Sequence, residues 1–242
     1  MLGVIDTSNQ RTGGNVIRLA ILAMLLPISA HAQANSAASA TGSPRTLVVC
    51  GIDRSGSAFT MVRAGMRLCS LEIAAAGPGT LIVIKWIAER SFAASATALR
   101  IRIPDAAANC GSLYDVRCRR TAQVAKRAGA AARREGIRRL MSLHPRPAAN
   151  TDLQGFLAAA ALEMEGAGPT RYRLVFASDL QSTVRQTALP QLPPGVEVKI
   201  GMLQIGNDVG RSSKLRSDWT RDLTQRGATS VTIVMLDAGE TR

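Results

Sequence analysis

Hard oxygen ligands gather directly after the first strongly apolar run of this 242-residue chain. The run Thr46-Leu-Val-Val-Cys-Gly-Ile52 is followed by Asp53-Arg-Ser55-Gly-Ser57. A buried strand that ends in a carboxylate and two hydroxyls places three oxygen ligands on one tight turn, and divalent cations such as Mg²⁺ and Ca²⁺ prefer such ligands. Alone, the Asp-x-Ser-x-Ser pattern is weak evidence, because a chain of this length contains it by chance roughly one time in twenty.

Two later positions strengthen the pattern. Thr151 opens a segment with helical apolar spacing, and Asp179 follows a second apolar run, residues 172–178. In open α/β sheets the ligand crevice lies outside the carboxyl ends of the strands. Asp53 and Asp179 are both expected at such an end, so the sequence predicts that they line one crevice.

The order of a strand, Asp-x-Ser-x-Ser, a later loop Thr and a later strand-end Asp resembles the von Willebrand factor A family and its metal-ion-dependent adhesion site. The resemblance spans about residues 45–237. The chain departs from the family in two places: Leu180 stands where the family usually has Gly, and the segment 103–150 is long and basic. The metal-site positions that the resemblance implies are Asp53, Ser55, Ser57, Thr151 and Asp179.

This resemblance implies a binding function that depends on a divalent cation, with Mg²⁺ expected first and Mn²⁺ or Ca²⁺ as alternatives. Ser55, Ser57 and Thr151 would coordinate directly in some states, and Asp53 and Asp179 directly or through water. Mg²⁺ takes about six oxygens and often keeps waters. Because hydroxyls do not neutralise the ion, it stays electrophilic, and an acidic residue of a protein partner can complete its shell.

Each of these residues also has a purely structural explanation. Asp53 belongs to a residue type that caps helices, and the hydroxyls of Ser55 and Ser57 can bond to the backbone of their own turn. Thr151 can be the N-cap of the helix that follows it. Asp179 can cap a short helix of its own.

Strands alternate with helices along the chain. This alternation predicts a doubly wound α/β fold with a mostly parallel sheet and helices on both faces. For the basic helix the expected inner side is Val124, Ala128, Ala131, Ile137 and Leu140; for the helix after Thr151 it is Leu153, Phe156, Leu157, Ala160, Ala161 and Met164. The expected strands are 45–53, 80–88, 98–103 (an edge), 171–178, 196–203 and 230–236, and the expected helices are 58–75, 117–141, 153–165 and 213–226.

Residues 1–32 have the pattern of a secretory signal peptide. Arg11 and Arg18 precede the apolar run 19–28, and Ala-His-Ala at 30–32 is a small-x-small cleavage site. No later stretch reaches about 18 uninterrupted apolar residues, so no transmembrane anchor is expected. The sequence predicts an exported chain, periplasmic or secreted, with a flexible lead-in at 33–44 and one domain at 45–242.

The chain contains four Cys. In an exported protein this favours disulfides over metal thiolates. Cys110 and Cys118 could close a short hairpin, and Cys50 on the first strand could bridge to Cys69 on the next helix. Buried free thiols are the alternative for the second pair.

The formal net charge is +13, and much of it lies in a basic helical insertion around 104–147. Such a surface favours acidic partners, anionic lipid or cell-wall polyanions, although a solvated helix face explains it equally well. Nucleic acid is disfavoured by export and by the absence of aromatic stacking platforms. The residues expected to contact a polyanion are Arg117, Arg119, Arg120, Arg127, Arg133 and Arg134.

No catalytic set is recognisable in the sequence. His144 is the only His after the signal segment and lies beside Pro145 in an expected linker, so we expect a surface His and no Ser–His triad, and no glycine-rich phosphate loop is present. We therefore expect a binding protein and not an enzyme. The alternative is an envelope polyanion-binding or assembly factor that uses the Arg-rich helix without metal. A metal-dependent hydrolase with Asp152 as base is the least favoured class.

Overall fold

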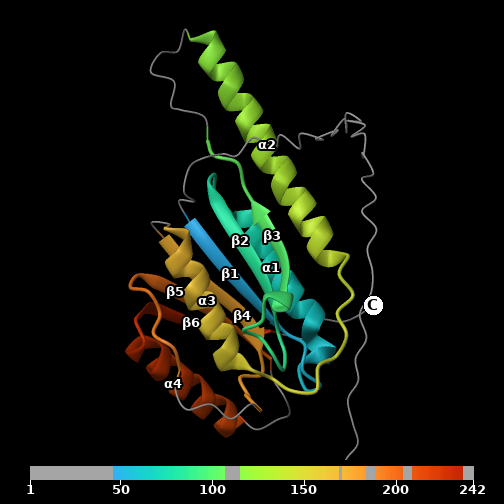
Figure 1. The fold of residues 1–242 in the computed structure, drawn as a ribbon, viewed down its shortest axis with the longest axis vertical. Helices are drawn as coiled ribbons and strands as arrows, with labels where there is room; N and C mark the ends of the chain where they lie inside the picture. The colour runs from blue at the N-terminus through green and yellow to red at the C-terminus, as the bar shows by residue number, and fades with distance from the viewer. Residues whose placement is uncertain (1–45, 107–114, 169–170, 184–188, 204–208, 237–242) are drawn as a thin grey trace, which may run out of the picture. The chain divides into compact units, whose positions relative to one another are not determined.

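The computed structural model describes residues 46–106, 115–168, 171–183, 189–203 and 209–236. They form one six-stranded sheet with α-helices, joined by two short 3₁₀ segments, Phe59–Met61 and Ala94–Ala96. The strands in Figure 1 are β1 (Thr46–Asp53), β2 (Thr80–Ile87), β3 (Thr97–Arg102), β4 (Arg171–Ser178), β5 (Val196–Leu203) and β6 (Ala228–Leu236), and the helices are α1 (Val62–Ala75), α2 (Val116–Met141), α3 (Leu153–Ala167) and α4 (Val209–Gln225).

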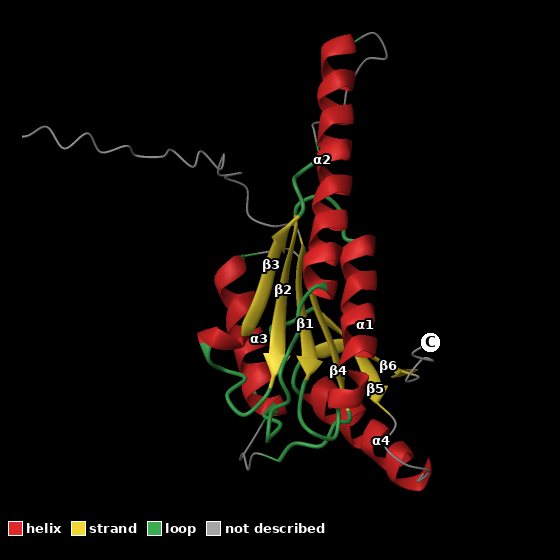
Figure 2. Cartoon of the chain, turned by 90° about the vertical axis from the view of Figure 1, so that its right-hand side faces the viewer, coloured by secondary structure: helices red, strands yellow, loops and turns green. Residues whose placement is uncertain are grey.

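The strand order is β3-β2-β1-β4-β5-β6, so the chain builds the sheet outward from β1 and then, from β4, in the other direction. All neighbouring pairs are parallel except β2 and β3. Figure 2 shows the arrowheads of β1 and β2 at one end of the sheet and that of β3 at the opposite end. The predicted doubly wound, mostly parallel α/β class is confirmed, and β3 is the predicted edge strand.

Helices cover both faces of the sheet because the central strands are apolar on both sides. On β1, Leu47 and Val49 belong to one core cluster with α3 and α4, whereas Val48, Cys50 and Ile52 belong to the other with α1 and the end of α2. This two-sided burial is what a central parallel strand requires.

The core under α3 contains the predicted packing residues. Leu153, Phe156, Leu157, Ala160, Ala161 and Met164 are all buried, as expected. The Phe156 ring packs directly over Gly51 of β1, where a Cβ would overlap the ring. Phe156 also makes an edge contact with Phe176 of β4, at 5.6 Å between ring centroids. The position of Gly51 thus lets α3 lie close to the strand that carries Asp53.

On the opposite face, Cys50 of β1 and Cys69 of α1 form a disulfide with a Cα–Cα distance of 6.1 Å. Of the two alternatives for this pair, the structure has the bridge and not free thiols. Cys110 lies outside the described residues, so its pairing with Cys118 stays a prediction.

The predicted inner side of α2 is wrong over most of its length. Val124 is 60 % exposed, and Ala128 and Ala131 are exposed as well. Only Ile137 and Leu140, near the C-terminal end, pack on the core as expected.

Glycines explain the difference. The buried residues of α2 are Gly129, Gly136 and Leu140, and a Cβ at Gly136 would lie 2.8 Å from Cδ1 of Ile101 on β3. The helix therefore approaches the sheet through its smallest residues. A search for apolar periodicity gives glycine no weight and selects a neighbouring stripe.

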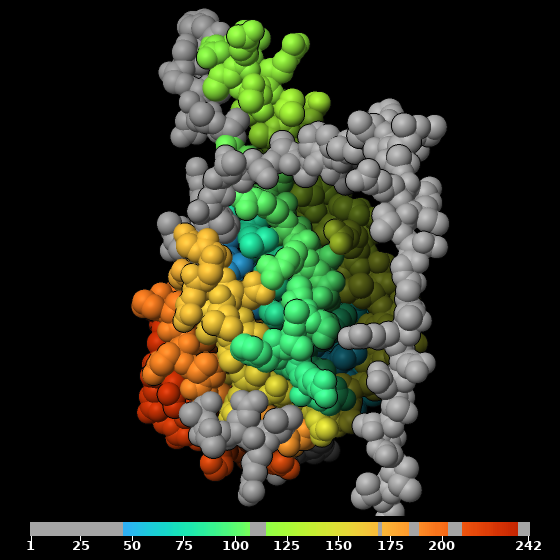
Figure 3. All heavy atoms as spheres, viewed as in Figure 1, coloured from blue at the N-terminus to red at the C-terminus, as the bar shows by residue number. Residues whose placement is uncertain are grey.

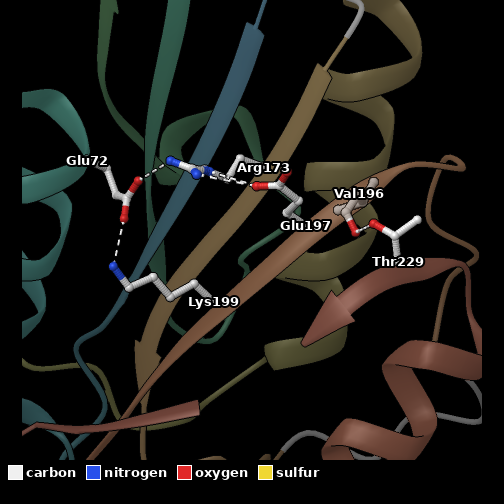
Figure 4. A network of polar contacts seen from close by, with 6 residues as sticks. All are labelled: Glu72, Arg173, Val196, Glu197, Lys199 and Thr229. Carbon is white, nitrogen blue, oxygen red and sulfur yellow. Dashed lines mark hydrogen bonds and ion pairs between the residues drawn. The ribbon is translucent and has the colours of Figure 1, made fainter. Parts of the chain in front are cut away.

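An ion-pair network ties α1 to β4 and β5 (Figure 4). The buried Glu72 carboxylate accepts hydrogen bonds of 3.0 Å from both Arg173 Nη1 and Lys199 Nζ, and Arg173 also pairs with Glu197. Two cations around one buried carboxylate satisfy its charge. The network holds α1 against β4 and β5.

Several element boundaries differ from the prediction: α3 ends at residue 167 and not 165, and β6 begins at residue 228 and not 230. The first helix begins as the 3₁₀ segment Phe59–Met61, and α4 already includes residue 209. Gly227, with φ 105°, ends α4 as expected. The predicted signal peptide at 1–32 and the lead-in at 33–44 lie outside the described residues. Among the described helices, none combines the length and apolar character needed to cross a membrane.

Candidate metal centre

The two acidic residues of the predicted site meet at one end of the sheet. β1 and β4 are parallel neighbours, with Ile52 opposite Ala177, so Asp53 and Asp179 follow at the same edge. The edge lies where the strand order reverses between β1 and β4, which is where doubly wound folds have their ligand crevice.

Asp53 is held by two hydrogen bonds and is only 1 % exposed. Its Oδ1 accepts from the Ser55 backbone N–H at 2.8 Å, and its Oδ2 accepts from Ser178 Oγ at 2.6 Å. Burial raises the pKa of Asp53 above its ordinary value of 3.8, and the hydrogen bonds from Ser178 and Ser55 oppose that shift only in part. The carboxylate therefore lacks a full complement of charge-stabilising groups.

Asp179 is 2 % exposed. Its Oδ2 accepts from Ser57 Oγ at 2.7 Å, and its Oδ1 accepts from the Gln181 backbone N–H at 3.0 Å. The Asp179 charge also contributes to the raised pKa of Asp53. Two buried carboxylates close enough to repel each other create a need for positive charge between them.

Ser55 supplies the clearest test of whether these residues suit a cation. It is 3 % exposed, and its buried Oγ makes no hydrogen bond of good geometry within the described residues, although it lies close enough to the Asp53 carboxyl to oppose the rise of its pKa. Buried polar atoms of native proteins are nearly always paired, so one without a good hydrogen bond calls for a ligand, ion or water. A cation that prefers oxygen ligands matches this hydroxyl beside two carboxylates.

Thr151 lies at the same edge of the sheet as Asp53 and Asp179, because hydrogen bonds hold its loop between two neighbouring segments. The Ala148 N–H donates to Arg54 O at 2.8 Å. The Thr151 N–H donates to Thr183 Oγ1 at 2.9 Å, and Thr151 O accepts from the Thr183 N–H at 3.0 Å. Thr151 is thus buried between the turn after β1 and the segment that follows Asp179.

The structural explanations for Thr151 and Asp179 do not hold. Asp152, not Thr151, is the N-cap of α3, since its Oδ1 accepts from the Gly155 N–H at 2.7 Å. No helix follows Asp179 in the described residues 180–183. The N-cap of α1 is Met61, which leaves Asp53 without a helix-capping role.

Leu180 has a backbone conformation that glycine adopts more readily than leucine. Its φ is 63°, and it is the only non-glycine residue in the described part of the chain with positive φ. Its side chain is 2 % exposed, and its carbonyl accepts from Trp219 Nε1 at 3.3 Å. Burial and this bond to α4 hold a leucine in the left-handed region.

The sequence interpretation missed Ser178. Its fully buried hydroxyl donates to Asp53 Oδ2 and accepts from the Leu180 N–H at 3.0 Å. A serine that closes an otherwise apolar strand directly before the second Asp was the available signal.

Within the described ranges, no group of three or more His, Cys, Asp or Glu could hold a metal ion. The predicted centre has a different composition, two carboxylates and three hydroxyls. The structure brings the loops that carry all five residues to one edge, and their binding of a cation stays a prediction.

Neither a protein-family model nor a curated protein matches this chain. Solved structures do. A von Willebrand factor type A protein from Catenulispora acidiphila is 13 % identical, with a TM-score of 0.44, over 81 % of this chain and 39 % of that chain. The ArnB paralog VWA2 from Sulfolobus acidocaldarius is 14 % identical, with a TM-score of 0.44, over 81 % and 42 %.

A third similar structure is proximal thread matrix protein 1 from the mussel byssus, solved with a zinc-occupied MIDAS motif. It is 11 % identical, with a TM-score of 0.41, over 79 % of this chain and 42 % of that chain. The chain thus spans less than half the length of each of these proteins. The strand order and directions described above are those of a doubly wound, mostly parallel α/β fold.

Proposed function

We propose that this chain is an exported binding module that engages an acidic side chain of a protein partner through a divalent cation. The cation-binding residues are Asp53, Ser55, Ser57, Thr151 and Asp179. The observation that carries the proposal is the buried Ser55 hydroxyl, which makes no hydrogen bond of good geometry within the described residues, beside two buried carboxylates.

The hydrogen bonds indicate which residues of the site would supply charge and which would orient the carboxylates. Asp53 and Asp179 supply the negative charge, and Ser178 and the backbone at Ser55 orient the Asp53 oxygens. The hydroxyls add oxygen ligands but no charge. A bound Mg²⁺ would supply a Lewis-acidic centre that a carboxylate of the partner can approach.

The test is the melting temperature of the chain in EDTA, Mg²⁺, Mn²⁺ or Ca²⁺. A ligand that binds only the folded state stabilises it by about 2.7 kcal/mol at 100 times its dissociation constant. We expect a rise in melting temperature with cation that Asp53→Ala abolishes. The matched control is Asp105→Ala, because Asp105 follows β3 at the opposite end of the sheet. Equal melting of the unmodified chain in all conditions would refute the proposal.

The second candidate function is the binding of polyanions by α2 without metal. A separate observation on the charge and exposure of this helix supports it. Residues 116–134 carry seven Lys or Arg and no Asp or Glu. No residue of 116–128 is buried. Figure 2 shows this half of α2 extending beyond the end of the sheet, and Figure 3 shows its atoms projecting from the rest of the described residues. Cationic side chains held away from the core can all face one extended anion.

Heparin chromatography tests this second function. The variant with Arg117, Arg119 and Arg120 changed to Gln should elute at lower salt than the unmodified chain, and EDTA should not change elution. The control changes three exposed arginines outside α2: Arg67, Arg171 and Arg221. If both triple variants elute together, binding reflects net charge alone and α2 is not a binding site.

A further inference from the structure

A hollow of about 400 Å³ opens beside the proposed cation site. Its charged and aromatic wall comes from Arg54, Trp86, Glu89 and Arg90. The volume falls within the range of pockets that bind small ligands. It is therefore large enough for one or two side chains of a partner.

The hollow adjoins the site through Arg54 and Ala88. Arg54 lies between Asp53 and Ser55 in sequence, and its backbone N–H donates to Ile87 O at 3.1 Å. Ala88, another wall residue, accepts from the Asp152 N–H at 3.0 Å, one residue after Thr151. The turn after β1 thus contributes to both the site and the hollow, and the loop of Thr151 is bonded to the wall of the hollow.

The charges of the hollow favour an anion. Glu89 Oε1 accepts from the Ala149 N–H at 2.7 Å. Backbone hydrogen bonds, from Glu89 itself and then from Ala149, lower the pKa of Glu89, so this carboxylate is charged and already engaged. Against this one negative charge stand two guanidinium groups, those of Arg54 and Arg90. One added carboxylate would make the hollow neutral.

Arg54 is held at the wall by its contacts. Its Nη1 donates to Arg146 O at 3.3 Å, and its Nε is buried. Arg90 is exposed at the rim. Guanidinium groups bind carboxylates through paired, charge-assisted hydrogen bonds.

We propose that this hollow binds a second acidic side chain of the same partner, held by Arg54 and Arg90. The inference rests on the proposed function: one carboxylate of the partner completes the cation shell, and a nearby one enters the hollow. The partner segment is therefore a short acidic peptide with two carboxylates and not a single exposed Asp or Glu.

Trp86 makes the hollow observable, because it lines the wall and the chain has only one other Trp. The probe is a capped triglutamate peptide, with capped triglutamine as the uncharged control, titrated in Mg²⁺ and in EDTA. Triglutamate should change the fluorescence of the unmodified chain, and Trp86→Phe should remove that change. Arg90→Gln and Arg54→Gln should each weaken binding about tenfold or more in both conditions.

Arg171→Gln, at the far end of β4, is the matched control and should bind like the unmodified chain. Because Arg90 is exposed, its variant tests the hollow even if Arg54→Gln unfolds the turn. Equal affinities for Arg90→Gln and Arg171→Gln, or equal binding of triglutamine, would overturn the inference. If the loss in Arg90→Gln persists but Mg²⁺ never strengthens binding, the hollow stands and the cation proposal fails.

Discussion

The Ser57 hydroxyl donates a 2.7 Å hydrogen bond to Asp179, although the two residues are 122 positions apart. Ser178, at the end of β4, donates in turn to Asp53 at the end of β1. Each carboxylate of the candidate site is thus oriented by a serine from the other strand's end. The geometry of the site depends on the pairing of β1 with β4, and the following predictions use that dependence.

Ser55→Ala should separate metal binding from folding. Removing a buried hydroxyl that lacks a hydrogen bond of good geometry should stabilise the chain in EDTA, by about 1 kcal/mol. The stabilisation by Mg²⁺ should decrease, because the cation loses an oxygen ligand. Urea unfolding in EDTA and in Mg²⁺ measures both effects. A variant less stable in EDTA, with an unchanged response to Mg²⁺, would show that the hydroxyl has a structural partner.

Asp53→Asn should change how stability depends on pH in EDTA. The pKa of Asp53 is raised in the folded state, chiefly by burial. The folded state therefore binds the Asp53 proton more tightly than the unfolded state does. The stability from this residue is fully present below the ordinary pKa of 3.8 and is lost as pH rises through the raised value.

Asn carries no charge, so the variant avoids this loss while keeping an acceptor for the Ser55 N–H. The stability of Asp53→Asn relative to the unmodified chain should rise with pH across that window and then level off. Urea unfolding at a series of pH values measures the difference. A pH-independent difference would mean that Asp53 is not desolvated in solution.

Ser178→Ala should destabilise the chain by about 2 kcal/mol near neutral pH, because the Asp53 carboxylate and the Leu180 N–H both lose a buried partner. It should also weaken the stabilisation by Mg²⁺, since Asp53 is no longer oriented. The control is Ser142→Ala, an exposed residue at the C-terminal end of α2, which should change stability by less than about 0.5 kcal/mol. Similar unfolding curves for the two variants would contradict the role given to Ser178.

Position 180 should favour Gly over Ala. Both Leu180→Gly and Leu180→Ala lose a buried side chain, which costs about 2–5 kcal/mol. Only Gly relieves the positive φ, so Leu180→Gly should be the more stable of the two by about 1 kcal/mol. At Leu174, buried in the extended strand β4, the order should reverse because Gly is unfavourable within a strand. Chemical denaturation of the four variants measures both differences.

The Cys50–Cys69 disulfide should contribute about 3 kcal/mol, since it closes a loop of 19 residues in the unfolded chain. Cys50→Ala, Cys69→Ala and the double variant should lose similar amounts, because either single change removes the same bridge. Urea unfolding under non-reducing conditions measures the losses. Strictly additive single losses would indicate that packing of the two side chains, and not the bridge, provides the stability.

Local patterns in the sequence determined the strands, the face of α3 that packs on the sheet, and the chemical types at the candidate site. β4 and β5 begin and end as predicted, because a turn segment with Gly and Pro precedes each and apolar residues, many of them β-branched or aromatic, follow it. The inner face of α3 was equally predictable, since large apolar residues recur there at helical spacing.

Tertiary structure alone decided the rest. The roles of Ser178 and Ser57, the disulfide of Cys50 and the left-handed backbone at Leu180 each depend on contacts between segments far apart in sequence. Side-chain spacing reports which face of an element is buried, but not what it is buried against. The inner face of α2 was mispredicted for that reason. Gly136 lies against Ile101 of β3, and α2 can approach the sheet there because Gly136 has no side chain. This contact is visible only in the assembled structure.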